Sequence, residues 1–134
     1  RAFMTLFYGL LDPNSGTFDY VCAGHPFPVL RRAGGELIEL GSGTLPLGMR
    51  QNLELPQSRV SIDHGDLLLL FTDGLPEAVD GPTGESFGFQ RLKDLLATVG
   101  SPRAVHDRIL LAFDQHIGHE PLTDDLTLMV VARA

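Results

Sequence analysis

Three acidic residues stand beside the two most apolar segments of this sequence, where they could act together. Asp73 directly follows the run 67–72, and Asp124 and Asp125 directly precede the run 126–132. If the two runs are antiparallel neighbours, the end of one strand lies beside the start of the other. We therefore expect Asp73 and Asp124 at the same sheet edge, about 5 Å apart. Carboxylates held that close repel one another unless a proton or a cation lies between them.

A hard divalent cation is the ligand that such a pair favours. Carboxylates without neighbouring Cys or clustered His prefer Mg²⁺ or Mn²⁺, and Gly74 allows the backbone to approach an ion or a phosphate closely. The alternative stays open at this point, because Asp-Gly after a strand is commonly a turn and Asp-Asp before a strand is commonly a solvated cap. Two carboxylates are also few ligands for a dinuclear site.

Other reactive side chains give weaker indications. His25 stands at a strand exit, where a structural and a functional role are both open, and Cys22 is expected to be a small buried apolar group. The sequence has no Ser in a Gly-x-Ser-x-Gly elbow and no phosphate loop of the P-loop or dinucleotide type. Nucleophilic catalysis by Ser or Cys is therefore unsupported.

Composition limits the class of protein. The chain has 134 residues, of which 43% are hydrophobic and 20% charged, so we expect a single domain with a real core. Its net charge of −7 argues against nucleic acid or an anionic membrane as partner. The apolar run 67–71 is far shorter than the ~20 residues of a membrane span. One cysteine permits no internal disulfide and is consistent with a reducing, cytoplasmic location.

The elements that must position the acidic residues are several strands, two helices and a last strand. We expect strands over 3–11, 17–22, 28–32, 36–40, 53–62, 67–71 and 126–132, the first four forming two hairpins and the last one central in its sheet. One helix carries Leu92, Leu95, Leu96 and Val99 at helical spacing and ends at Gly100, and a second runs from Pro102, after Ser101 as N-cap, to Gly118. This order predicts an α+β fold with a mainly antiparallel sheet.

The chain starts at Arg1 and by Phe3 is already in strand-like sequence. We therefore expect residues 1–134 to be the C-terminal part of a longer domain.

Six motifs, in order along the whole chain, resemble one protein family. They are FMTLFYG at 3–9, AGHP at 23–26, LPLG at 45–48, GDLLLLFTDGLPEA at 65–78, GESFG at 84–88 and DDLTL at 124–128. Together they are similar to the SpoIIE-like branch of the PPM-type, metal-dependent protein phosphatases.

The resemblance implies a β-sandwich flanked by helices, with two Mn²⁺ or Mg²⁺ ions at one edge. It implies that Asp73 and Asp124 are metal ligands, adjoined by Gly74 and Asp125. It also implies that no side chain acts as nucleophile and that water activated by the ions would take this role. The implied substrate is phosphoserine or phosphothreonine on a regulatory protein, typically an anti-sigma-factor antagonist of a bacterial stress or sporulation pathway.

The family's first metal motif, an Asp followed shortly by Gly-His-Gly, is absent, as are the strands and two long helices that precede FMTLFYG. We therefore expect 1–134 to be a single incomplete phosphatase domain, inactive alone, whose parent chain carries the missing ligand and an upstream regulatory domain. A non-catalytic or truncated phosphatase-fold module that binds a partner is the alternative. A homodimer that fills the open sheet positions also remains open.

Overall fold

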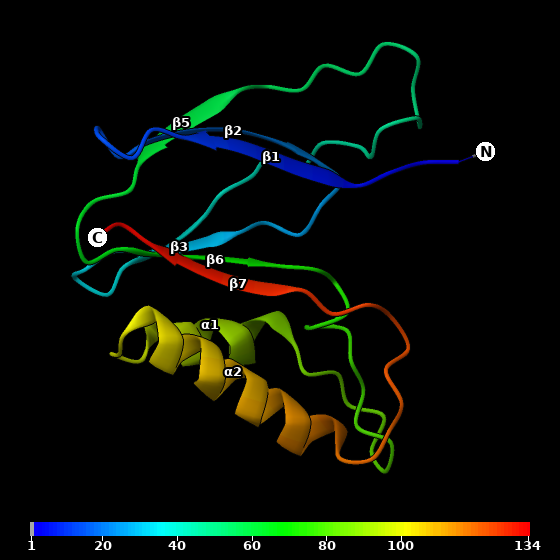
Figure 1. The fold of residues 1–134 in the computed structure, drawn as a ribbon. Coiled ribbons are helices and arrows are strands. Elements are labelled where there is room, and N and C mark those ends of the chain that lie inside the picture. The colour runs from blue at the N-terminus through cyan, green and yellow to red at the C-terminus, as the bar shows by residue number, and fades with distance from the viewer. Residues whose placement is uncertain (1) are drawn as a thin grey trace.

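The computed structural model describes residues 2–134, which form seven strands and two helices (Figure 1). The elements are β1 (Leu6–Leu11), β2 (Thr17–Ala23), β3 (Val29–Arg31), β4 (Leu37–Glu39), β5 (Ser58–Ser61), β6 (Leu67–Phe71), α1 (Phe89–Ala97), α2 (Pro102–Ile117) and β7 (Leu128–Ala132).

The strands make two antiparallel sheets. One sheet has the order β1-β2-β5 and the other the order β4-β3-β6-β7. Figure 1 shows the sheets face to face, with α1 and α2 covering the outer face of the four-stranded sheet. The expected α+β fold, a β-sandwich flanked by helices, is confirmed, and so are both hairpins, β1-β2 and β3-β4.

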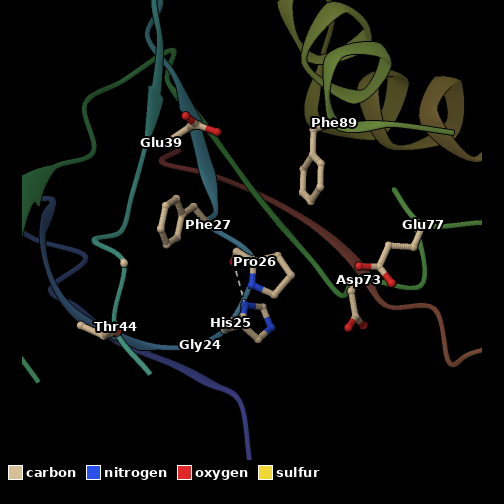
Figure 2. A pocket seen from close by; sticks show the side chains of 10 residues that line it. Gly24, His25, Pro26, Phe27, Glu39, Thr44, Asp73, Glu77 and Phe89 are labelled. Carbon is tan, nitrogen blue, oxygen red and sulfur yellow. Dashed lines mark hydrogen bonds between the residues drawn. The ribbon is translucent and has the colours of Figure 1, made fainter. Parts of the chain in front are cut away.

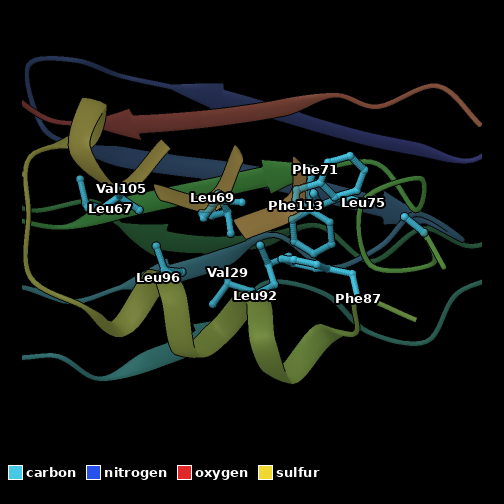
Figure 3. Close-up of a cluster of buried hydrophobic side chains, with 12 residues drawn as sticks. Val29, Leu67, Leu69, Phe71, Leu75, Phe87, Leu92, Leu96, Val105 and Phe113 are labelled. Carbon is cyan, nitrogen blue, oxygen red and sulfur yellow. The ribbon is translucent and has the colours of Figure 1, made fainter. Parts of the chain in front are cut away.

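Two apolar layers explain why the run at β6 is continuously apolar. Leu68 packs between the two sheets, against Phe18, Leu30, Leu40 and Ile62. Its neighbours on β6 face the helices instead, in a larger cluster (Figure 3) made of Val29, Leu67, Leu69, Phe71, Leu75, Ala78, Phe87, Leu92, Leu96, Val105, Ile109 and Phe113. Because successive residues of a strand point to opposite faces, a strand covered on both faces needs apolar residues throughout.

The last strand differs from its expected position. β7 begins at Leu128, two residues later than expected. Within the described residues 2–134 it lies at the edge of its sheet beside β6, so its prediction as a central strand is wrong for this chain. Its apolar character has another cause: Leu128 and Val130 pack toward the helices, whereas Val131 packs between the sheets. A strand can be covered on both faces by neighbouring layers and still have an open hydrogen-bonding edge.

The helix ends follow local signals with one exception. Ser101 caps α2 by accepting a hydrogen bond from the Ala104 N–H (3.2 Å), and Gly118 ends it with φ 58°. The placement of Val99 on the first helix is wrong, because α1 ends at Ala97 and the Val99 residue is 89% exposed. Thr98 turns the chain to extended geometry, and its hydroxyl donates to the Leu95 carbonyl (3.0 Å).

Within residues 2–134, no helix combines the length and the apolar character that crossing a bilayer requires.

Candidate active site

Antiparallel pairing gathers four loops at one end of the four-stranded sheet. The end of β6, Phe71, is paired with the start of β7, Leu128. The start of β3, Val29, is paired with both Leu69 of β6 and Glu39 at the end of β4. The turn after β6, the loop before β7, the loop that leads into β3 and the loop after β4 therefore meet at the same edge.

Thr72 ties the two acidic turns together. Its backbone N–H donates to the Thr127 carbonyl (3.1 Å), and its hydroxyl accepts from the Thr127 N–H (2.9 Å). The same hydroxyl lies 3.2 Å from the carbonyl oxygen of Asp125 and donates to it. The predicted pairing of these strand ends is confirmed at the backbone. Convergence of the Asp73 and Asp124 carboxylates stays a prediction.

Gly74 is required by the closeness of the two turns. It is buried, and a Cβ added there would overlap the carbonyl oxygen of Asp125. Since Gly74 is not among the residues with positive φ, the requirement is one of space and not of backbone conformation.

The three acidic residues of the two turns line two separate hollows. Asp73 lines a hollow of about 490 Å³ together with His25 and Glu77, whereas Asp124 and Asp125 line another of about 590 Å³. Asp73, Asp124 and Asp125 are all exposed. Their carboxylate oxygens suit a hard cation in type. They do not suffice in number, because the described residues 2–134 contain no group of three or more His, Cys, Asp or Glu arranged to hold an ion.

The first hollow combines carboxylates, aromatic rings and one imidazole (Figure 2). Glu77 lies one turn after Asp73, and its backbone N–H donates to the Asp73 carbonyl (3.0 Å). Phe27 and Phe89 supply apolar wall, and Glu39 completes the lining from β4. Asp73 and Glu77 form no salt bridge with any residue of the described chain, whereas Glu39 accepts from Lys93 at 3.0 Å.

The His25 loop is held by its neighbours. The Nδ1–H of His25 donates to the Pro26 carbonyl (2.8 Å), drawn as a dashed line in Figure 2. The Cys22 thiol donates to the His25 carbonyl (3.3 Å), and the Thr44 hydroxyl donates to the Cys22 carbonyl. Burial raises the pKa of the Cys22 thiol, so the group stays protonated at neutral pH, as expected for a structural cysteine.

Asp66 has a structural role at the far end of β6, about 20 Å along the strand from Asp73 by its rise per residue. Its buried carboxylate accepts from the Asp63 N–H (2.9 Å), the Ala33 N–H (2.9 Å) and the Arg32 guanidinium (2.7 Å). These partners anchor the turn between β5 and β6. Asp66 is thereby excluded as a ligand beside Asp73.

Several residues at this edge gave weak or no signal in the sequence. Thr72 looked like the last residue of an apolar run, and Phe89 and Glu39 looked like ordinary helix and strand residues. The position of Thr72 depends on the pairing of β6 with β7, and Glu39 reaches this edge through the pairings of β3 with β4 and with β6. The Thr-Asp-Gly succession at a strand end is the one local sign that points to Thr72.

The comparisons with known proteins agree on one family. The family model described as Stage II sporulation protein E (SpoIIE) matches residues 1–134. Protein IcfG of Synechocystis is 33% identical over 132 residues, which are 98% of this chain and 21% of that protein. Phosphoserine phosphatase RsbP of Bacillus subtilis is 34% identical over 94 residues, 70% of this chain and 22% of that protein. The chain thus spans about a fifth of the length of these relatives.

Solved structures agree in fold. The SiaA-PP2C domain of Pseudomonas aeruginosa superposes with a TM-score of 0.82 at 19% identity, over 96% of this chain and 51% of that one. The RsbU and RsbW domains of a Mycobacterium tuberculosis protein match with a TM-score of 0.72 at 32% identity, over 96% and 36%. The chain belongs to the SpoIIE family of PPM-type (PP2C) phosphatase domains.

Proposed function

We propose that the protein carrying this chain is a metal-dependent phosphatase that hydrolyses phosphoserine or phosphothreonine on a bacterial regulatory protein. The observation that carries the proposal is the hydrogen-bonded junction at Thr72, which joins the turn of Asp73 to the turn of Asp124 and Asp125. The printed names of RsbP and RsbU, both phosphoserine phosphatases, support the reaction.

The metal site of this proposal is shared with another part of the protein. Asp73 and Asp124 would hold Mn²⁺ or Mg²⁺, with Gly74 and Asp125 adjoining them, and a further carboxylate outside residues 1–134 would complete the ligand set. The donor type supports the proposal, and the lack of a third converging ligand among the described residues explains why the set must be completed elsewhere. Bound ions of this kind lower the pKa of water and offset charge on a phosphoryl group.

The chain's own contribution is to bind and to position. Gly74 keeps the two turns in contact, and Thr72 fixes their register by three hydrogen bonds. The turn from Asp73 to Glu77 presents both carboxylates to the hollow in front of it (Figure 2). Because no Ser or Cys nucleophile is needed, the buried, protonated Cys22 is compatible with the reaction.

The proposed setting is cytoplasmic signal transduction. The substrate would be an anti-sigma-factor antagonist, and a regulatory domain elsewhere in the protein would control activity. A fragment of a regulatory domain accompanies the phosphatase domain in one SpoIIE structure from Bacillus subtilis, which matches this chain at 20% identity with a TM-score of 0.74. The acidic net charge remains an argument against nucleic acid or an anionic membrane as partner.

Phosphate release from a phosphoserine peptide by the full-length protein, with and without Mn²⁺, tests the proposal. Asp73→Asn and Asp124→Asn should each reduce Mn²⁺-dependent turnover by several orders of magnitude without unfolding the protein. Asp114→Asn, an exposed position on α2, is the matched control and should keep wild-type activity. Full activity of Asp73→Asn would contradict the proposed site.

A non-catalytic phosphatase-fold module is the second candidate. It is favoured by one observation, the absence of a three-ligand group within residues 2–134. The coding sequence upstream of Arg1 separates the two functions. An Asp-x-x-Gly-His-Gly-like motif there supports the enzyme, whereas a start codon directly before Arg1 supports the module.

A further inference from the structure

We infer that a hollow at the end of the four-stranded sheet opposite Asp73 is a binding site for a small organic anion, whose oxyanion group is held by Arg31. The hollow has a volume of about 430 Å³. It lies about 20 Å along β6 from Asp73, by the rise per residue, at the end where α1 is connected to α2 (Figure 1). The inference concerns a ligand other than the substrate and does not depend on the proposed function.

The last row of residues across the sheet leaves the space. Arg31 is paired with Leu67, and Leu67 is paired with Ala132, so the three residues form a row across β3, β6 and β7. All three line the hollow, and Gly100 and Pro102 line it from the connection between α1 and α2. Because Ala132 is small and the Arg31 guanidinium turns toward the end of α1, the row leaves a gap beside this connection.

Arg31 uses one of its three guanidinium nitrogens to hold α1. It is 8% exposed, and its Nη1 donates to the carbonyls of Leu96 (3.0 Å) and Thr98 (2.7 Å), which take both hydrogens of that nitrogen. Nε and Nη2 have no partner within residues 2–134. Since no fully buried side-chain nitrogen of these residues is left unpaired, both atoms are open to the hollow that Arg31 lines. They form the edge of the guanidinium that can bind two oxygens of one carboxylate or phosphoryl group.

The hollow has a surplus of positive charge. Arg133 also lines it and donates to two backbone carbonyls of the turn between β1 and β2, at 3.3 and 2.5 Å. Neither Arg31 nor Arg133 forms a salt bridge in the described part of the chain. The carboxylate that lines the hollow, Asp66, already accepts from Arg32. A buried cation without a counter-ion is costly, so a ligand that supplies negative charge beside Arg31 is favoured.

The lining also suits an apolar part of the ligand. Pro102 and Ala132 provide apolar surface beside the two arginines. The volume of the hollow falls within the range of about 300–1,000 Å³ that is usual for sites of small organic molecules. A carboxylate or phosphoryl group on a small apolar body therefore matches both the charge and the lining of the hollow.

Isothermal titration calorimetry of the full-length protein, freed of divalent metal, tests the site with three probes. Phenylphosphonate and benzoate carry the two kinds of oxyanion on the same ring, and benzamide is the neutral reference. Without metal, the acidic edge at Asp73 repels anions and does not contribute. We expect at least one of the two anions to bind with a dissociation constant of about 1 mM or lower, and at least tenfold more tightly than benzamide. The preferred anion then shows whether the ligand is a phosphoryl compound or a carboxylate.

Two variants test whether binding takes place at this hollow. Arg31→Lys keeps a cation near the end of α1 but lacks the paired Nε and Nη2 donors, so it should weaken binding of the preferred anion at least about tenfold. Ala132→Glu places a carboxylate at the exposed end of the row, where it repels the anion, and should weaken binding by a similar factor. Leu111→Glu makes the same change of charge at an exposed position of α2 that does not line the hollow, and it should bind like wild type.

The support that Arg31 gives to α1 requires a separate check of folding. Circular dichroism shows whether each variant is folded, and if Arg31→Lys is not, Ala132→Glu decides, because it leaves Arg31 and its bonds to α1 in place. Equal affinities of Ala132→Glu and Leu111→Glu would overturn the site, and so would failure of both anions to bind wild type. No phosphatase activity enters these measurements, so failure of the proposed function leaves the test of this site unaffected.

Discussion

Single residues at the two ends of β6 show how position decides what a carboxylate does. Asp66 is buried at one end, among three donors, and Asp73 is exposed at the other, where it faces a hollow. Burial alone raises the pKa of Asp66. Hydrogen bonds from the Asp63 N–H, the Arg32 guanidinium and the Ala33 N–H outweigh it, so that the pKa of this carboxyl is lowered overall.

Stability should therefore depend on the ionisation of Asp66. Because the pKa is lower in the folded protein, this contribution is fully present above about pH 4, the usual range of Asp in an unfolded chain, and disappears as the pH falls through the folded value. Asp66→Asn should reduce the free energy of unfolding by about 2 kcal/mol at pH 7, with a smaller difference from wild type near pH 3. Urea unfolding at both pH values measures it. The exposed Asp63→Asn is the control, and an effect as large as that of Asp66→Asn would contradict the explanation.

Gly74 yields a second prediction at this scale. In Gly74→Ala, the new methyl group would overlap the Asp125 carbonyl and push apart the turns that Thr72 joins. We expect Mn²⁺-dependent turnover of the full-length protein to fall at least about tenfold. Gly34→Ala is the matched control, because a Cβ there meets no atom within 4 Å. Unchanged turnover in Gly74→Ala would mean that the contact between the turns is not needed.

Among the elements, α2 carries much of the outer layer over the sheet. It buries Val105, Ile109 and Phe113 against the four-stranded sheet and α1. Its C-terminal turn also reaches the loop before α1, since His116 Nε2–H donates to the Glu85 carbonyl (2.9 Å) and Nδ1 accepts from Arg91 (2.8 Å). The helix therefore supports the turn-containing segment that leads away from Asp73.

The N-cap of α2 should contribute measurably to stability. Ser101→Ala removes the acceptor of the Ala104 N–H and should lower the free energy of unfolding by about 1 kcal/mol. Ser42→Ala, an exposed loop position whose side chain has no hydrogen bond among the described residues, should change it by less than about 0.5 kcal/mol. Thermal unfolding followed by circular dichroism compares the two. A cap variant as stable as the control would show that α2 is held by packing alone.

For the molecule as a whole, the proposal that the metal site is shared with another part of the protein predicts what residues 1–134 can do alone. We expect the isolated chain to bind Mn²⁺ weakly, above the low micromolar range, because its two turns offer too few converging donors. Isothermal titration calorimetry measures this, with Asp73→Asn as reference for non-specific binding. Affinity in the low micromolar range or tighter would show that a ligand within the chain has gone unidentified, with Asp125 and Glu77 the first positions to replace.

The phosphatase activity of the isolated chain should also be limited by its small number of metal ligands. The isolated chain should release little or no phosphate from a phosphoserine peptide in Mn²⁺, while the full-length protein is active, since loss of a ligand that positions the ions costs several orders of magnitude in rate. Sedimentation of the isolated chain at several concentrations is a necessary companion, because the open edges of β1 and β7 could pair between copies. Robust turnover by the isolated monomer would refute the prediction.

Local signals in the sequence determined much of the fold. Alternation and turn residues predicted both hairpins, Ser101 and Gly118 marked the ends of α2, and the apolar run at β6 predicted a strand covered on both faces. These features depend on neighbours in the chain, so backbone preferences and hydrophobic periodicity suffice to find them. The same reasoning predicted that the ends of β6 and β7 meet, which the pairing of Phe71 with Leu128 confirms.

Tertiary structure alone decided the rest. The apolar character of β7 could not reveal that it is an edge strand, because covering layers act on its faces and not on its edge. Val99 continues the helical spacing of apolar residues in the sequence, although the backbone has already left the helix at Thr98. Above all, the pairings of β3 with β4 and β6 bring His25, Glu39 and Asp73 to the same hollow. No local sequence pattern predicts that these residues lie together, because the pairing of strands depends on how the whole sheet buries its apolar residues.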